Sequence, residues 1–264
     1  MTLPLSGVGP TITGGGALDP NTISGLTLYL DANDLATLWQ TDDTSTPVAA
    51  DGDAIGRWLD KSGGAKVLSQ ATAGERPTWR NAQTGANGRG AMVTPATAGA
   101  GSKYLLGATT TASLFGATEA TLFLVFRSAT TGANQTILRD SGGLLLLRWS
   151  GATTLFLQLW NGTAGQSQLS LTAAAATTYI ICVRRSSVPT LYASLNGGAE
   201  TSVASAGILV FGADTQALPC VQASTKHDGW IGHWLTYNRD LTAGERNQIG
   251  QWLAGLYGLT WTNQ

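Results

Sequence analysis

The feature that most constrains the fold is a series of short apolar segments that recurs along the chain from residue 25 onward. Each has about four to eight residues, the length of a β-strand, and most end at residues typical of turns. Asn161-Gly162 and Asn196-Gly197 are strong signals for tight turns, because these residue types accept the positive φ that such turns need. Strands this short and this numerous predict one all-β sandwich rather than alternating strands and helices. The clearest segments are 26–30, 122–126, 144–149, 155–160, 179–183, 191–195 and 230–237.

One helix is predicted, near the end of the chain at about residues 242–256. Thr242 and Glu245 have the spacing of a capping box, in which each side chain satisfies a backbone N–H at the start of the helix. Apolar residues then follow at helical spacing and form one face. Gly255 or Gly258 can end the helix. We expect this amphipathic helix to cover an open side of the sandwich. Its apolar face consists of Ile249, Trp252, Leu253 and Leu256.

The first residues, 1–22, differ from the rest and are predicted to form an extended N-terminal arm, with the sandwich domain at 23–264. Glycines and prolines interrupt every regular pattern in the arm. One interpretation is a disordered terminus. The other is a segment that anchors the domain to a partner subunit through its apolar residues. These residues are Leu3, Leu5, Val8 and Ile12.

The charge of the chain limits its partners. Only 12% of the residues are charged and the net charge is −1, against about 25% charged in an average soluble domain. The scattered basic residues do not form the patch that a nucleic-acid-binding protein needs. No apolar run is long enough to span a membrane, and the N-terminus lacks the pattern of a signal peptide. Cys182 and Cys220 are too few for a disulfide framework, and whether they pair stays open.

Four segments resemble the concanavalin-A-like (laminin-G-like) jelly-roll family. They are 25–34, with sequence GLTLYLDAND, 56–63, with sequence GRWLDKSG, 75–77, with sequence ERP, and 230–239, with sequence WIGHWLTYNR. The resemblance covers about residues 25–260 and implies a jelly-roll sandwich of two antiparallel sheets with one C-terminal helix. Relatives often carry an acidic residue near the position of His233, so no role of that carboxylate transfers to this chain. The fold hosts lectins, enzymes and virion components and does not specify a function by itself.

The sequence offers no catalytic site of a familiar kind, and we predict that the chain is not an enzyme. Retaining glycosidases need two carboxylates about 5 Å apart, yet none of the glutamates lies close in sequence to another. The two histidines, His227 and His233, lie in or beside a predicted strand; His233 alternates there with Ile231, Leu235 and Tyr237, as a packed or surface residue would. The glutamates are Glu75, Glu119, Glu200 and Glu245.

Two binding sites are candidates. Many concanavalin-A-like lectins hold Ca²⁺, and Asp31, Asn33 and Asp34 offer the oxygen ligands that calcium prefers; the alternative is that these residues cap turns. A glycan site needs an exposed aromatic side chain beside amide or hydroxyl groups. The candidates for it are Trp160, Asn161, Trp149 and Trp79.

These observations lead to two predicted functions. The first is a structural or accessory protein of a tailed-phage virion, made in the host cytoplasm without a signal peptide. Its arm would bind capsid or tail subunits and its jelly roll, in a homo-oligomer, would face outward. The alternative is a lectin-like module that binds cell-surface glycan. Both functions can coexist in one protein.

Overall fold

The structure is a computed structural model that describes residues 18–94, 105–110, 113–116, 118–132, 135–140, 145–160, 166–205, 215–218 and 227–264. Within them the chain forms two β-sheets, three short 3₁₀ helices and one α-helix, α1 (Ala243–Tyr257). The 3₁₀ helices are η1 (Pro20–Thr22), η2 (Leu35–Thr37) and η3 (Ala73–Glu75). None of the described helices is long and apolar enough to cross a membrane.

Sheet A has eight strands in the described residues. In space the order is β15-β14-β13-β8-β17-β6-β5, and β1 also pairs with β17. β17 is the centre of this sheet, because β8 runs along its whole length on one side while β6 and β1 share the other side. The strands are β1 (Leu26–Asp31), β5 (Thr78–Arg80), β6 (Ala91–Thr94), β8 (Ala120–Ser128), β13 (Thr178–Arg185), β14 (Thr190–Leu195), β15 (Thr201–Ala204) and β17 (Gly229–Tyr237).

Sheet B has nine described strands in the order β12-β11-β10-β9-β16-β7-β4-β3-β2. All pairings that the structure describes in both sheets are antiparallel. The predicted all-β sandwich with one C-terminal helix is therefore confirmed. The strands are β2 (Leu38–Trp39), β3 (Arg57–Leu59), β4 (Val67–Ser69), β7 (Leu105–Thr110), β9 (Gln135–Asp140), β10 (Leu145–Trp149), β11 (Thr154–Trp160), β12 (Gln166–Thr172) and β16 (Thr215–Leu218).

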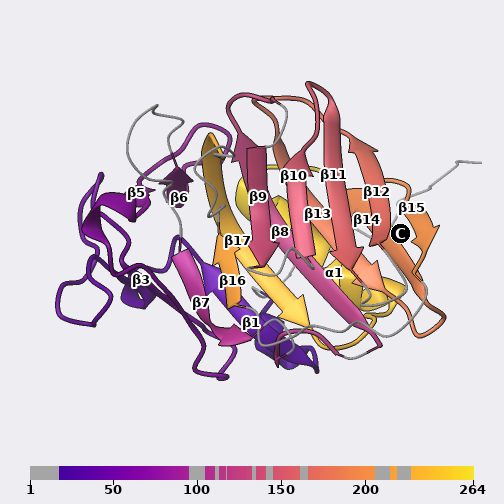
Figure 1. Cartoon of the computed structure of the whole chain (residues 1–264), viewed down its shortest axis with the longest axis horizontal. Coiled ribbons are helices and arrows are strands. Elements are labelled where there is room, and N and C mark those ends of the chain that lie inside the picture. Colours follow the sequence, from indigo (N-terminus) through magenta and orange to yellow (C-terminus); the bar gives the residue numbers. More distant parts are fainter. Residues whose placement is uncertain are drawn as a thin grey trace, which may run out of the picture.

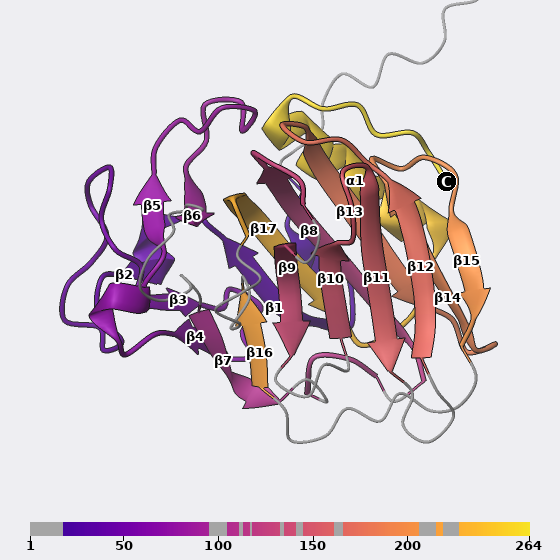
Figure 2. The same ribbon diagram turned by 45° about the horizontal axis from the view of Figure 1, so that its top comes forward.

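The molecule has three layers, with sheet B in front, sheet A behind it and α1 on the far side of sheet A (Figures 1 and 2). One apolar core fills the space between the sheets and includes Trp58, Trp149 and Trp234. A second core lies between sheet A and α1 and includes Phe123, Leu235 and Leu253. Sheet A is thus buried on both faces.

This double burial explains the sequence of β8, which is apolar almost throughout. Leu122, Leu124 and Phe126 belong to the core between the sheets, whereas Phe123 and Val125 belong to the core under α1. A strand of which both faces are covered loses the alternation of apolar and polar residues. β10, in contrast, keeps that alternation, with buried residues separated by half-buried ones.

The helix begins as predicted. The Thr242 side chain accepts a hydrogen bond from the Glu245 backbone, and the Glu245 carboxylate accepts one from the Thr242 backbone. Gly258 ends α1 in the left-handed conformation, with φ 64°. The buried face differs partly from the predicted one. Ile249 and Leu253 are buried with Ala254 and Tyr257, whereas Trp252 and Leu256 are half-buried at the border of this core.

His233 is a packed residue, one of the two predicted possibilities, but a β-bulge in β17 breaks the predicted alternation with Ile231. The pairing of β17 with β8 shifts between Ile231 and His233, so Ile231 lies in the core between the sheets while Leu235 lies in the core under α1. A bulge inserts one residue and turns the following side chains to the other face. Ile231 and His233 therefore do not share a face, and His233 is fully buried beneath α1. A Cβ at Gly232 would lie 2.0 Å from the Tyr257 hydroxyl, so only glycine fits at the bulge.

The last residues of the predicted arm pack against the domain. Pro20 is buried, and its carbonyl accepts a hydrogen bond of 3.4 Å from the Tyr237 hydroxyl. Leu18 contacts the core under α1. The proposed anchoring residues Leu3, Leu5, Val8 and Ile12 lie outside the described residues.

Cys182 is a buried small apolar residue, as predicted, with 2% of its surface exposed. It is a free thiol in the core under α1. Burial raises the pKa of Cys182 to about 12, which keeps the thiol protonated and unreactive. Cys220 lies outside the described residues.

Candidate functional site

The predicted calcium ligands lie at the end of β1, where basic side chains surround them. Asp31 Oδ1 lies 3.3 Å from His233 Nε2 and 3.5 Å from an Arg89 nitrogen, and Lys61 Nζ lies 2.6 Å from Asp34 Oδ2. The Asn33 side-chain oxygen accepts a hydrogen bond from the Gly90 backbone. These contacts use the oxygens that calcium would need.

The electrostatics of Asp31 follow from the same contacts. Burial alone would raise the pKa of Asp31, but the hydrogen bond with His233 and the nearby positive charges hold it well below its usual value. His233 also contacts the Tyr257 hydroxyl, which lies 2.6 Å from Nδ1. Burial lowers the pKa of His233 although Asp31 opposes this.

The cluster of Asp31, His233 and Tyr257 therefore joins β1, β17 and α1. No group of three or more metal-binding side chains occurs in the described part of the chain. Asp34 caps η2 through the Ala36 backbone and Asp31 accepts from the Asn33 backbone, which are the contacts that the turn-capping alternative predicts. Calcium binding by Asp31, Asn33 and Asp34 stays a prediction.

Two of the predicted glycan-binding tryptophans are in the interior. Trp149 is fully buried and Trp79 is 6% exposed. The Trp149 indole donates to the Ser128 hydroxyl over 2.8 Å, and the Trp79 indole donates to the Ala32 carbonyl over 2.8 Å. Neither can present a ring to a sugar, because both rings fill the core between the sheets. Trp160 ends β11 and pairs with Gln166, but its side chain and Asn161 lie outside the described residues.

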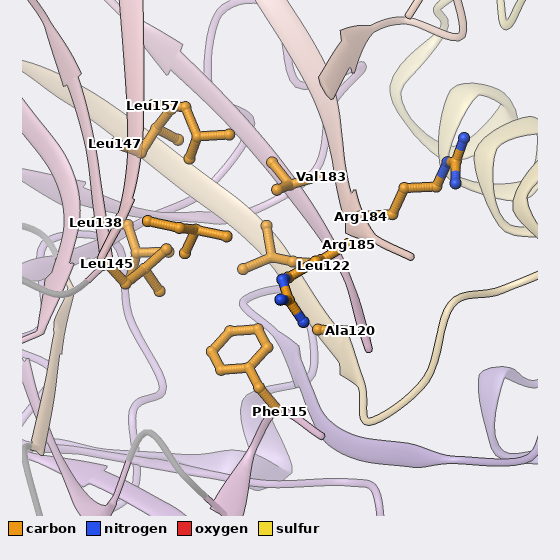
Figure 3. Close-up of a pocket in the computed structure, with 11 residues that line it drawn as sticks. Phe115, Ala120, Leu122, Leu138, Leu145, Leu147, Leu157, Val183, Arg184 and Arg185 are labelled. Atoms are coloured by element: carbon orange, nitrogen blue, oxygen red, sulfur yellow. The ribbon is translucent and has the colours of Figure 1, made fainter. Parts of the chain in front are cut away.

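The cavity between the sheets is not a ligand site either. Figure 3 shows it surrounded by leucines, with Phe115 and Arg185 at one end. Its volume is about 20 Å³, which is room for about one water molecule. A saccharide does not fit there.

An open groove on the outer face of sheet A, beyond the end of α1, is the best candidate site. It consists of a larger hollow of about 640 Å³ and a smaller one of about 230 Å³. Thr84 and Arg127 line both hollows, so the two adjoin. We call the two together the polar groove. The larger hollow is lined further by Gly85, Asn87, Thr177, Thr178, Asn196 and the residues that end α1, and the smaller one by Gln83, Asp228 and Trp230.

The loop between β5 and β6 forms one wall of the polar groove and is fixed by three long-range hydrogen bonds. The Thr178 hydroxyl donates to the Gly85 carbonyl over 2.7 Å, and the Trp230 indole donates to the Thr84 carbonyl over 3.1 Å. The Asn87 amide donates to the Leu256 carbonyl at the end of α1. This wall is therefore tied to β13, β17 and α1 at once, and a ligand meets a preformed surface.

The backbone of this loop needs unusual conformations. Gly85, Asn87 and Gly88 all have positive φ, which glycine and asparagine adopt most easily. A Cβ on Gly85 would lie 2.6 Å from the Thr178 hydroxyl and 3.0 Å from Arg127 Cδ. Glycine at this position allows the loop to pack closely against both side chains.

The opposite wall comes from two turns. Thr177 and Thr178 follow a turn in which Ala176 has positive φ, and the Ala176 backbone donates to the Ser128 carbonyl over 2.7 Å. Asn196 begins the turn predicted from Asn196-Gly197, with φ 51° and 71° at the two residues. Its side-chain oxygen accepts a hydrogen bond from the Ile180 backbone, which fixes the side chain against sheet A.

The chemistry of the lining favours binding rather than bond cleavage. Hydroxyl and amide side chains line both hollows, together with Arg127 and one carboxylate, Asp228. Saccharides have many hydroxyl groups that donate and accept hydrogen bonds, and such a lining can satisfy both roles. Tyr257 and Trp230 border the groove as a stacked pair with 5.9 Å between ring centroids, and both are almost fully buried.

The sequence alone did not predict the polar groove. The lining residues come from the loop at 81–90, the end of β8, two turns and the end of α1, and no motif links them. The one available signal was the sequence Gly85-Ala86-Asn87-Gly88 between two strands, which indicates a tight, ordered loop.

The sequence matches no protein-family model and no curated protein. The structure, however, is similar to solved structures of clostridial toxins. The binding domain of Paraclostridial Mosquitocidal Protein 1 has 10% sequence identity and a TM-score of 0.60, over 86% of this chain and 52% of that chain. The botulinum neurotoxin serotype D binding domain has 10% identity and a TM-score of 0.58, over 86% of this chain and 50% of that chain.

A third similar structure is the binding domain of botulinum neurotoxin DC in complex with SialylT. It has 11% identity and a TM-score of 0.53, over 88% of this chain and 52% of that chain. This chain thus spans about half the length of each of the three. At such low identity the likeness shows a shared fold: the protein has the β-sandwich architecture found in these toxin binding domains.

Proposed function

We propose that this chain is a non-catalytic carbohydrate-binding module and that the saccharide lies in the polar groove. The observation that carries the proposal is the groove itself, an open and preformed surface of about 640 Å³ with hydroxyl and amide groups on both walls. The core cavity is too small for a sugar, and Trp79 and Trp149 are buried.

The shared fold supports this proposal. The similar structures are binding domains, and one of them is in complex with a ligand whose name contains a sialyl group. Membership of the concanavalin-A-like family, which the sequence suggests, is part of the same proposal, because that fold hosts many lectins. Of the two functions predicted from the sequence, the glycan-binding alternative has this support.

Placement on a virion stays a prediction. It depends on the arm, whose residues Leu3, Leu5, Val8 and Ile12 lie outside the described residues, and on partners such as capsid or tail subunits and other copies of the chain. It does not compete with the proposal, since a module displayed on a particle can bind glycan on a host surface.

The test is to block the groove without touching the core. Thr177 is exposed and lines the larger hollow, so Thr177→Trp fills part of the groove. Val188 is 73% exposed and is not among the lining residues, so Val188→Trp adds the same side chain elsewhere. A glycan array identifies ligands of the unaltered protein, and calorimetry then compares the three proteins.

We expect Thr177→Trp to weaken binding by about tenfold or more, since steric exclusion removes several contacts together, and Val188→Trp to bind as the unaltered protein does. Unchanged binding by Thr177→Trp would place the ligand elsewhere. Loss of binding in Trp160→Ala with no loss in Thr177→Trp would place the sugar at the turn after β11. The absence of any glycan ligand would contradict the proposed function.

A further inference from the structure

Arg127 is the basic residue among those that line the polar groove. It lies near the end of β8, opposite Thr178 of β13 and Trp230 of β17. Strand alternation places it on the same face as Phe123 and Val125, the face that α1 covers further along β8. Because α1 and its cap end at Gly258, the half-buried Arg127 side chain opens into the groove instead of lying beneath the helix.

The guanidinium of Arg127 has no hydrogen-bond or ion-pair partner among the residues that the structure describes. Most arginines elsewhere in the described chain are paired. Arg184, for example, contacts Glu200 over 2.7 Å and Asp240 over 3.0 Å. The arginines that form ion pairs are Arg76, Arg80, Arg89, Arg184, Arg239 and Arg246.

A partly desolvated cation without a partner is unfavourable, and an anion that binds it recovers that free energy. The stem of Arg127 also packs closely against the loop between β5 and β6. The space beside the Gly85 Cα is occupied by Arg127 Cδ and Nε, which lie 3.0 and 3.2 Å from the position of an added Cβ. This packing restricts the stem of the side chain, and the planar fork of a guanidinium matches a carboxylate with two parallel hydrogen bonds.

We infer that the groove selects acidic saccharides and that Arg127 is the residue that binds their carboxylate. This inference rests on the proposed function and names its substrate class. The carboxylate lies in the larger hollow, because Asp228 lines the smaller one and repels a second negative charge. Asp228 instead accepts hydrogen bonds from neutral sugar hydroxyls, as it does from the Thr130 hydroxyl over 3.0 Å.

The experiment compares matched pairs of acidic and neutral sugars. Sialyllactose is compared with lactose, and trigalacturonate with its methyl ester, by calorimetry at low and high salt. Sulfated galactose oligosaccharides distinguish a sulfate from a carboxylate. The proteins are the unaltered chain, Arg127→Gln, Arg127→Lys and Thr177→Trp, each with its near-UV circular dichroism recorded to show that it is folded.

We expect the unaltered protein to bind at least one acidic sugar about tenfold or more tightly than its neutral partner. Arg127→Gln should remove that preference, and Arg127→Lys should restore part of it, because lysine keeps the charge but not the two-pronged geometry. Thr177→Trp should weaken acidic and neutral sugars alike.

Two results would overturn the inference and leave the proposed function intact. The first is equal affinity for acidic and neutral sugars in the unaltered protein. The second is a preference for acidic sugars that persists in Arg127→Gln. A preference for sulfate over carboxylate would overturn the choice of carboxylate. If no saccharide of either kind binds, the proposed function itself fails.

Discussion

The outer faces of the two sheets differ. That of sheet A is apolar where α1 covers it, with Phe123, Val125 and Ile180 beneath the helix. That of sheet B, along β10–β12, carries half-buried or exposed residues such as Arg148, Gln158 and Gln168. α1 thus forms a third layer on the outer face of sheet A, and no third layer covers the outer face of sheet B in the described part of the chain. The polar groove lies where α1 ends. The helix therefore both stabilises sheet A and determines where a ligand can reach that sheet.

The largest expected effect tests the covered face. Leu253 of α1 is fully buried in the core under the helix, and Leu253→Ala should lower the free energy of unfolding by about 2–5 kcal/mol, through lost burial and a cavity. Phe156 is half-buried on the outer face of sheet B, and Phe156→Ala should cost about 1 kcal/mol or less. Urea denaturation measures both. Equal losses of unfolding free energy in the two variants would mean that the core under α1 is packed no more tightly than the outer face of sheet B.

Acid should weaken the layer between the sheets through His227. Its ring nitrogens lie 3.1 Å from the Thr94 hydroxyl and 3.0 Å from the Ser128 hydroxyl, and burial lowers its pKa to about 3. The unfolded chain binds this proton below about pH 6.5 and the folded one does not, so stability falls as the pH falls. The expected loss from this residue between pH 7 and pH 4 is roughly 3 kcal/mol.

Unfolding curves at several pH values test this. His227→Gln should be less stable at pH 7 but should lose less stability on acidification than the unaltered protein. His233 and Asp31, under the helix, act in the same direction, since the pKa of each is lowered in the folded state. An unchanged pH dependence in His227→Gln would show that the acid sensitivity comes from other groups, among them His233 and Asp31.

Local signals predicted much of the fold and little of the site. The capping box of Thr242 and Glu245 and the Asn196-Gly197 turn are readable because they depend on residues close in sequence. The need for glycine at the bulge is not, because it depends on the Tyr257 hydroxyl, which comes from a distant part of the sequence. Burial of Trp79 depends likewise on which way its strand faces.

The site was harder still to predict from the sequence, because the polar groove joins segments from residue 83 to residue 259. Most of its polar lining residues are threonine, asparagine, glutamine and arginine, types that are common on any surface. Arg127 has no ion-pair partner among the described residues, and this can be recognised only when the acidic side chains near the other arginines have been located. Composition argued against a nucleic-acid partner but could not indicate the place of the proposed saccharide site.

A smaller effect on stability is expected at the start of α1. Thr242→Ala removes the side-chain oxygen that accepts from the Glu245 backbone and should lower stability by about 1 kcal/mol. Thr172 is exposed on β12 of sheet B, so Thr172→Ala is the matched control and should change stability by about 0.5 kcal/mol or less. Thermal unfolding compares them. If the two variants melt alike, the capping box does not contribute to the stability of the third layer.

The smallest effect is expected on the bare face of sheet B. The Arg148 guanidinium lies 5.1 Å from the Phe156 ring centroid, and the two residues are opposite each other on β10 and β11. A double-mutant cycle with Arg148→Gln and Phe156→Ala isolates this pair from the other contacts of Arg148, and we expect a coupling of about 0.5–1 kcal/mol. The same variants should leave saccharide binding unchanged, because neither residue lines the polar groove. A loss of sugar affinity in Phe156→Ala, with the fold retained, would move the binding site to the uncovered sheet and reverse the roles of the two faces.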